Sequence, residues 1–107
     1  MKRMYVIVRT LRLQKGLREQ YTQRFSMPSP VTKAKGFIRR DVLFSQRDKE
    51  YDVCRIIIYW QDKKAFYAWE GSPEHIAMHK NKVQQKDPNI LESTHEAFEV
   101  IASIEHE

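Results

Sequence analysis

Two histidines and a tryptophan lie close together in the second half of the sequence, and these residue types can bind metal ions or flat aromatic molecules. Trp69 is followed by His75 and His79, which are four residues apart. On a helix, side chains with this spacing lie on the same face. A neutral imidazole is a good metal ligand, and a bulky indole can pack against the face of a ring system. These three residues are therefore a candidate binding site.

The same residues also fit an ordinary packed corner. Ile76, His79 and Val83 recur at i, i+3 and i+7, so His79 is expected on an apolar helix stripe that faces the core. Histidines in such positions are usually hydrogen-bonded structural residues. Trp69 and Phe66 belong to a second stripe that packing alone explains. A zinc site is a weaker interpretation still, because no third ligand has a recognisable spacing.

The periodicity of apolar residues predicts the elements that must position this stretch. In chain order these are a strand over 4–13, a helix over 15–25, strands over 36–46 and 50–60, helices over 61–71 and 73–83, and a strand over 95–105. Prolines and polar residues predict loops over 27–35 and 86–94. This order is typical of an α+β fold of ferredoxin-like type, an antiparallel sheet with its helices on one face.

The third predicted strand is apolar on both faces. Cys54, Ile56 and Trp60 alternate with Ile57 and Tyr59. A sheet with helices on one face and water on the other does not need this pattern. The 107 residues suit a single domain, 1–107, with too little chain for a second layer of helices. We therefore expect a homodimer in which two sheets pair into a dimeric α+β barrel.

Composition narrows the classes of partner. The net charge is +5, but the basic residues are spread along the chain among acidic ones, without a nucleic-acid-binding motif, so no nucleic acid is expected. No run of about 18 apolar residues exists, so no membrane partner is expected. Arg9 and Arg12 interrupt the apolar N-terminal stretch, which is unlike a signal peptide. With a single cysteine, Cys54, the chain fits the reducing cytoplasm.

Two spacings connect the chain to a known family. Trp69 and His79 form the pattern W-x9-H, and Tyr59-Trp60 is followed by Phe66 in the pattern YW-x5-F. With the order of elements, these patterns resemble the antibiotic-biosynthesis-monooxygenase (ABM) superfamily, and most closely its IsdG-type haem-degrading monooxygenases. The resemblance covers most of the chain and is strongest over residues 36–82.

The resemblance implies a function for the marked stretch. In this family each subunit of a dimeric α+β barrel holds haem between its helices and its sheet. By position, His79 would be the axial ligand of the haem iron, and Trp69 would help to distort the haem. Phe66 and Ile76 would contact the cofactor. Haem would be both substrate and cofactor, and the enzyme would use O2 and an external electron donor to open the ring and release iron.

One feature of the family's pocket is missing. The family has an asparagine on the first strand, whereas the first asparagine of this chain is Asn81. Alignment from the N-terminus puts Ile7 at that place, and counting back from the Lys15-Gly16 pair puts Arg9 there. An inward Arg9 could donate to bound oxygen or pair with a haem propionate. We expect haem binding to survive this difference more readily than turnover.

Two other functions remain open from the sequence. The first is a cofactor-independent monooxygenase of the wider superfamily that acts on an aromatic phenol or quinol. It would need no cofactor and would use Trp69, Tyr67 or Tyr21 to orient the substrate and stabilise its anion. The second is a non-catalytic dimer that only binds a small molecule in the same pocket.

Overall fold

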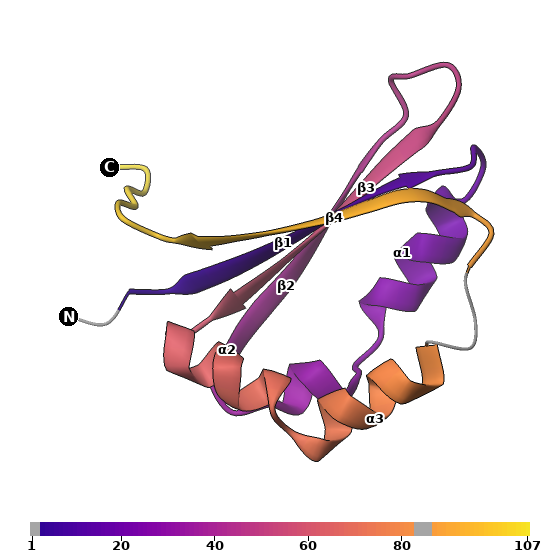
Figure 1. The fold of residues 1–107 in the computed structure, drawn as a ribbon. Helices are drawn as coiled ribbons and strands as arrows, with labels where there is room; N and C mark the ends of the chain where they lie inside the picture. Colours follow the sequence, from indigo (N-terminus) through magenta and orange to yellow (C-terminus); the bar gives the residue numbers. More distant parts are fainter. Residues whose placement is uncertain (1–2, 83–86) are drawn as a thin grey trace.

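Four strands form one antiparallel sheet in the order β2-β3-β1-β4, and the helices lie on one side of it (Figure 1). The computed structural model describes residues 3–82 and 87–107. Its elements are β1 (Tyr5–Leu13), α1 (Arg18–Ser26), the 3-10 helix η1 (Pro30–Lys33), β2 (Phe37–Ser45), β3 (Asp52–Trp60), α2 (Lys63–Glu70), α3 (Pro73–Lys82) and β4 (Ile90–Glu99). The prediction of a ferredoxin-like α+β fold is confirmed.

The last strand differs most from its prediction. It starts at Ile90, inside the segment that was expected to be a loop, and ends at Glu99. It pairs with the whole of β1, from Leu13 opposite Ile90 to Tyr5 opposite Glu99, with an irregularity next to Leu13. The prediction was wrong because β4 is an edge strand with both faces largely exposed, so its polar residues resemble a loop.

Two smaller differences concern the helices. The segment expected to be a proline-rich loop contains η1, which carries Pro30 at its start and is closed by hydrogen bonds between Ser29 and Thr32. The expected end of the last helix at Val83 lies outside the described residues, which place α3 as far as Lys82. Within the described parts of the chain, none of the helices is long and apolar enough to cross a membrane.

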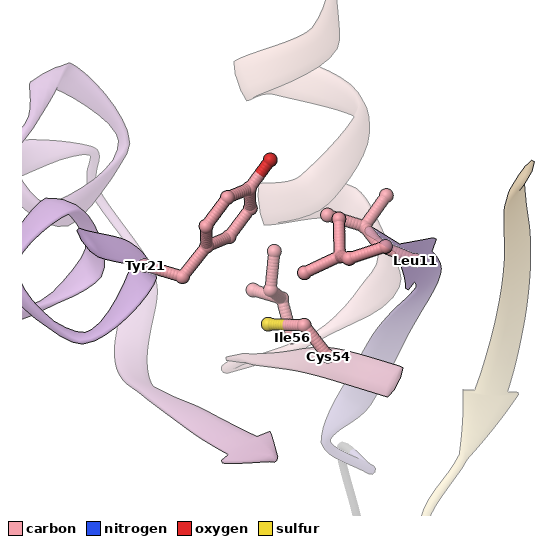
Figure 2. Packing of buried hydrophobic residues seen from close by; sticks show 5 residues of the cluster. Leu11, Tyr21, Cys54 and Ile56 are labelled. Atoms are coloured by element: carbon pink, nitrogen blue, oxygen red, sulfur yellow. The ribbon is translucent and has the colours of Figure 1, made fainter. Parts of the chain in front are cut away.

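The core on the helix side of the sheet is divided into two clusters. The Tyr21 cluster comprises Leu11, Leu13, Tyr21, Cys54 and Ile56 and fastens α1 to β1 and β3 (Figure 2). The Trp60 cluster comprises Tyr5, Val31 and Trp60 and fastens η1 and α2 to the other end of the same strands. The helix layer is thus anchored at two separated places along the sheet.

The opposite face of the sheet is only partly covered within one chain. Val6 is buried there, but Leu43 and Phe98 are each 49% exposed, and Ile57 between them is half-buried. The third strand is therefore fully buried on its helix side alone. If the expected dimer forms through the open face of the sheet, this apolar area is the surface that the partner would cover.

Two glycines have a positive φ, and one of them lies where the sheet closely approaches α2. Gly36 has φ +89° at the start of β2, and a Cβ there would overlap the Cβ of Ala65 in α2. Gly16 has φ +92°, and a Cβ there would meet open space. Both positions favour glycine because of the backbone, but only one is also crowded.

We predict that Gly36→Ala destabilises the fold more than Gly16→Ala. Gly16→Ala should lower the free energy of unfolding by about 1 kcal/mol because of the strained backbone. Gly36→Ala adds the overlap with Ala65, which should cost about 1–3 kcal/mol more. Urea unfolding of both variants measures the difference. Equal losses would mean that α2 does not rest on this corner of the sheet.

Candidate functional site: a cavity between helices and sheet

A cavity of about 490 Å³ lies between the two anchored ends of the helix layer. This size is within the ~300–1,000 Å³ typical of pockets for small molecules and cofactors. The sheet contributes the apolar side chains Ile7, Ile56 and Ile58 to its lining. Helices α2 and α3 contribute aromatic rings and imidazoles. The cavity therefore joins an apolar floor to groups that can bind a metal or a planar ligand.

Aromatic side chains form one end of the cavity. The Trp69 ring stacks on Trp60, with centroids 6.4 Å apart and planes 28° from parallel. Phe66 contacts Trp60 edge-on at 6.0 Å. The Asp62 carboxylate accepts the Ala65 N–H at 2.8 Å and caps the start of α2, which helps to set the direction of these rings. A planar ligand would meet a surface of aromatic rings that pack on one another.

A sharp corner between α2 and α3 brings the tryptophan and the first histidine together. The Ser72 hydroxyl donates to the Trp69 carbonyl at 2.6 Å, and its oxygen accepts the His75 N–H at 3.2 Å. One side chain thus closes α2 and caps α3. As a result, the rings of Trp69 and His75 lie 5.4 Å apart.

The two histidines are hydrogen-bonded to each other. His75 Nδ1 lies 2.9 Å from the Glu70 carbonyl oxygen, which can only accept, so Nδ1 carries a proton. In the neutral ring Nε2 is then an acceptor. His79 Nε2 lies 3.1 Å from it and supplies the proton of that bond when both rings are neutral. To bind a metal through Nε2, His79 must leave this bond and carry its proton on Nδ1.

Most of the residues singled out from the sequence meet at this cavity. Trp69, His79, Phe66, Ile7 and Arg9 all line it. Ile7 and Arg9 both point inward, because residues two apart on a strand share a face. His79 lines the cavity although its side chain is also exposed to solvent.

Ile76 is not among the residues that line the cavity. It is 47% exposed, so the expectation that it shares an inward stripe with His79 is wrong. The side of α3 that lines the cavity carries His75, Met78 and His79, at i, i+3 and i+4. Val83, the third member of the expected stripe, lies outside the described residues. The Ser72 cap fixes where α3 begins and so how the helix is rotated about its axis, and this rotation decides which residues face inward.

The two tyrosines proposed for a cofactor-independent reaction do not line the cavity. Tyr67 is 53% exposed on the outer side of α2. Tyr21 is fully buried in its cluster, where its hydroxyl donates to Asp87 Oδ2 at 3.1 Å. Burial, with this carboxylate, raises the pKa of Tyr21. Of the three residues named for that reaction, only Trp69 can touch a ligand here.

Several lining residues were missed in the sequence. Arg24, Arg40, Met78 and His95 line the cavity from α1, β2, α3 and β4. Arg40 could have been found, because its alternation with Val42 places both on the helix side of β2. Its guanidinium donates to the carbonyls of Phe25 at 2.7 Å and Met27 at 2.9 Å, and to the Ser29 hydroxyl at 3.3 Å. Arg40 therefore holds the wall between α1 and η1.

The lining carries more positive than negative charge. Arg9, Arg24 and Arg40 contribute cations, whereas Glu70 is the carboxylate among the lining residues of the described chain. Burial lowers the pKa of both Arg9 and Arg40 from the usual value of a guanidinium. Residues 3–82 and 87–107 contain no group of three side chains that could hold a metal ion by themselves. A metal bound here would have to bring other ligands with it.

We predict that Trp69 shapes the cavity more than it stabilises the fold. Trp69 is half-buried, whereas Trp60 is 1% exposed at the centre of its cluster. Trp69→Phe should lower the free energy of unfolding by about 1 kcal/mol, and Trp60→Phe by about 2–3 kcal/mol, because only the latter leaves a closed void. Thermal unfolding of both variants compares them. A larger loss for Trp69→Phe would make that ring a core residue.

Comparisons of sequence agree with this fold and site. A model of the antibiotic biosynthesis monooxygenase family matches residues 4–81. The haem-degrading monooxygenase HmoA of Bacillus subtilis is 29% identical over 91 residues, which cover 85% of this chain and 84% of that protein.

Comparisons of structure give the same architecture. A Bacillus cereus protein assigned to the same family superposes with a TM-score of 0.82 at 23% identity, covering 97% of this chain and 99% of that one. MhuD of Mycobacterium tuberculosis, a haem degrader with two haems bound in its active site, gives 0.67 at 19% identity, covering 94% and 99%. SnoaB of Streptomyces nogalater, a cofactor-independent oxygenase, gives 0.67 at 16% identity, covering 96% and 98%.

These solved structures share the fold but differ in their chemistry, so the fold does not choose the substrate. The sequence match decides the family, because it covers well over half of the chain. The chain therefore belongs to the antibiotic biosynthesis monooxygenase family, and it is a monooxygenase-type oxidoreductase with haem-degrading enzymes among its relatives.

Proposed function

We propose that this enzyme binds haem in the cavity, with His79 as the axial ligand of the iron, and opens the haem ring oxidatively to release the iron. The observation that carries the proposal is the meeting of His79, Trp69 and an apolar floor in one cavity. The names of relatives such as HmoA support the same substrate. The reaction would use O2 and electrons from an external donor in the cytoplasm, the compartment that suits the single, buried Cys54.

The residues of the cavity fit haem. Two imidazoles cannot enclose a bare metal ion, but one imidazole suffices for an iron that is already held by four porphyrin nitrogens. Ile7 and Phe66 offer apolar surface to the ring, and the arginines offer charge to its propionates. When bound, haem would supply both the metal that activates oxygen and the carbon skeleton that is oxidised.

The chain's own residues would prepare this reaction in separate ways. His79 would give up its hydrogen bond to His75 and bind the iron instead. The hydrogen bond from His75 to the Glu70 carbonyl would keep the second ring in place. Trp69, supported by Trp60, would press on one face of the ligand. The apolar side chains would exclude water from the reacting face. Arg9, beside Ile7 on the floor of the cavity, would donate hydrogen bonds to the ligand.

We predict that His79→Ala loses the histidine-ligated ferric haem spectrum and most of the affinity for haem. Titration of the purified protein with ferric haem, followed by the Soret band, measures both. His75 lies on the same helix, and its Nε2 is 3.1 Å from that of His79, so it must be tested as a rival ligand. His75→Ala should keep the ligated spectrum, and the double variant should behave like His79→Ala.

The outcomes separate the hypotheses. A ligated spectrum that survives His79→Ala but is lost in the double variant would assign the iron to His75. Wild-type protein without a saturable haem spectrum at micromolar concentration would eliminate the haem proposal. Turnover is measured separately, with ascorbate as reductant and with catalase to remove peroxide, by bleaching of the Soret band and release of iron. Native circular dichroism of each variant is required for the comparison.

A cofactor-independent oxidation of an aromatic phenol is the second candidate. The observation in its favour is the Arg9 guanidinium on an apolar floor, which could stabilise a phenolate, in a fold shared with the oxygenase SnoaB. Oxygen uptake with phenolic substrates and without added haem tests it. Saturable binding of a ligand with neither activity would instead support a non-catalytic binding protein.

We also propose that two chains pair through the open face of the sheet. The half-exposed Leu43 and Phe98 on either side of Ile57 support this proposal, because apolar groups of this size on one face are usually covered. The interface would close the sheets into a barrel. A dimer would also hold both sheets rigid beneath their cavities.

We predict that Ile57→Asp converts a dimer into a monomer or an unfolded chain. Burying an unpaired carboxylate in this interface should cost several kcal/mol, on the order of 3 kcal/mol or more. Sedimentation velocity measures the mass. Ile76→Asp makes the same change on the outer side of α3 and should leave the mass unaltered. A wild-type chain that sediments as a stable folded monomer would contradict the proposed interface.

A further inference from the structure

Arg9 is a cavity-lining arginine without an anionic partner among the described residues. Its Nε donates to the Ser93 hydroxyl at a long 3.4 Å, and its two terminal nitrogens have no acceptor in the described parts of the chain. No carboxylate of residues 3–82 or 87–107 forms an ion pair with it. The remaining segments, 1–2 and 83–86, contain no aspartate or glutamate. The chain therefore leaves this charge uncompensated.

Three other arginines, Arg12, Arg24 and Arg40, have carboxylate or carbonyl partners within the chain. Arg12, on the same strand but on the other face, lies 3.3 Å from a carboxylate oxygen of Glu92. Arg24 lies 3.8 Å from Asp87. Arg40 uses its guanidinium to bind two carbonyls and a hydroxyl. Of these four arginines, Arg9 is the one to which the described residues supply neither a carboxylate nor a carbonyl partner.

The surroundings make this unpaired charge costly. Arg9 is half-buried and shares the floor of the cavity with Ile7 and Ile56. Burial is the main cause that lowers its pKa; of its neighbours, Tyr21 and Cys54 raise the pKa and Arg24 lowers it. A guanidinium does not lose its proton at neutral pH, so the cost is not relieved by deprotonation. An anion that enters the cavity would relieve both the lost hydration and the repulsion between the two cations.

We propose that Arg9 binds an anionic oxygen of the cavity's ligand, a carboxylate or a phenolate, on the floor formed by β1. The proposal rests on the proposed function, since it takes this cavity as the ligand site, and it adds the orientation of the ligand. The acidic group points toward the sheet at Arg9, and the apolar body lies toward the aromatic end. For haem this group is a propionate, and for a phenolic substrate it is the ionised hydroxyl.

The two sources of the anion are tested with matched pairs of probes. Iron-free protoporphyrin IX carries two carboxylates, and its dimethyl ester carries none. 2-Hydroxy-1,4-naphthoquinone is ionised at neutral pH, and its methyl ether is neutral. None of these probes contains iron, so ligation by His79 contributes nothing to binding. Quenching of tryptophan fluorescence in the full-length protein gives the dissociation constants.

The variants isolate the guanidinium. Arg9→Gln keeps hydrogen-bond donors without the charge, and Arg9→Lys keeps the charge without the planar fork. Arg12→Gln is the matched control, because it removes a cation from the same strand on the opposite face. If the role of Arg9 is ligand binding rather than folding, Arg9→Gln should leave the melting temperature unchanged or raise it.

Wild-type protein should prefer the acid over the ester in at least one pair, on the order of tenfold or more, as charge-assisted hydrogen bonds give. Arg9→Gln should abolish most of that preference, while the neutral probes bind as before. Arg9→Lys should retain part of the preference. Arg12→Gln should retain all of it. The pair that shows the effect identifies the carboxylate or the phenolate as the source.

Three results would overturn the proposal. The first is an acid preference in neither pair, and the second is a preference that survives Arg9→Gln. The third is an equal loss of acid and neutral probes, with a lowered melting temperature, which would make Arg9 structural. A haem titration that fails for the wild type while the naphthoquinone preference depends on Arg9 would reject the haem function and keep this inference.

Discussion

The helix layer of this protein is held against the sheet at two places and not between them. The Tyr21 cluster fastens α1 at one end of β1 and β3, and the Trp60 cluster fastens η1 and α2 at the other. The floor between these clusters is formed by Ile7, Ile58 and the charged Arg9, with Ile56 of the Tyr21 cluster at its edge. The cavity is thus a direct product of how the core is divided, and the same clusters that stabilise the fold keep it open.

The chemistry of the cavity depends on a corner of the main chain as well as on side chains. The Ser72 hydroxyl joins the end of α2 to the start of α3, and the Glu70 carbonyl holds His75. Together they set the tautomer that His75 presents to His79. The hydrogen-bond partner that His79 meets is therefore held in place by a backbone group several residues away. Spacing in the sequence identifies such a pair, but not the state of its protons.

The sequence predicts the order of elements well because apolar periodicity marks strands and helices that face a core on one side. It fails for β4, whose residues from Leu91 to Phe98 are exposed on an edge and alternate weakly. Ile76 was misplaced because a short helix with few apolar residues gives no clear inward side, whereas the cap at Ser72 does. The shared inward direction of Ile7 and Arg9 was available from strand alternation alone.

Arg40 shows how this architecture could diversify. One guanidinium on β2 holds the carbonyls of Phe25 and Met27 and the hydroxyl of Ser29, so a whole stretch of connecting chain depends on a single anchor. The anchor lies in the sheet, while the stretch itself contributes little to either core cluster. Insertions or substitutions between α1 and η1 can therefore remodel one wall without disturbing the scaffold. For laboratory evolution, this segment is the natural place to widen the range of substrates while the melting point is preserved.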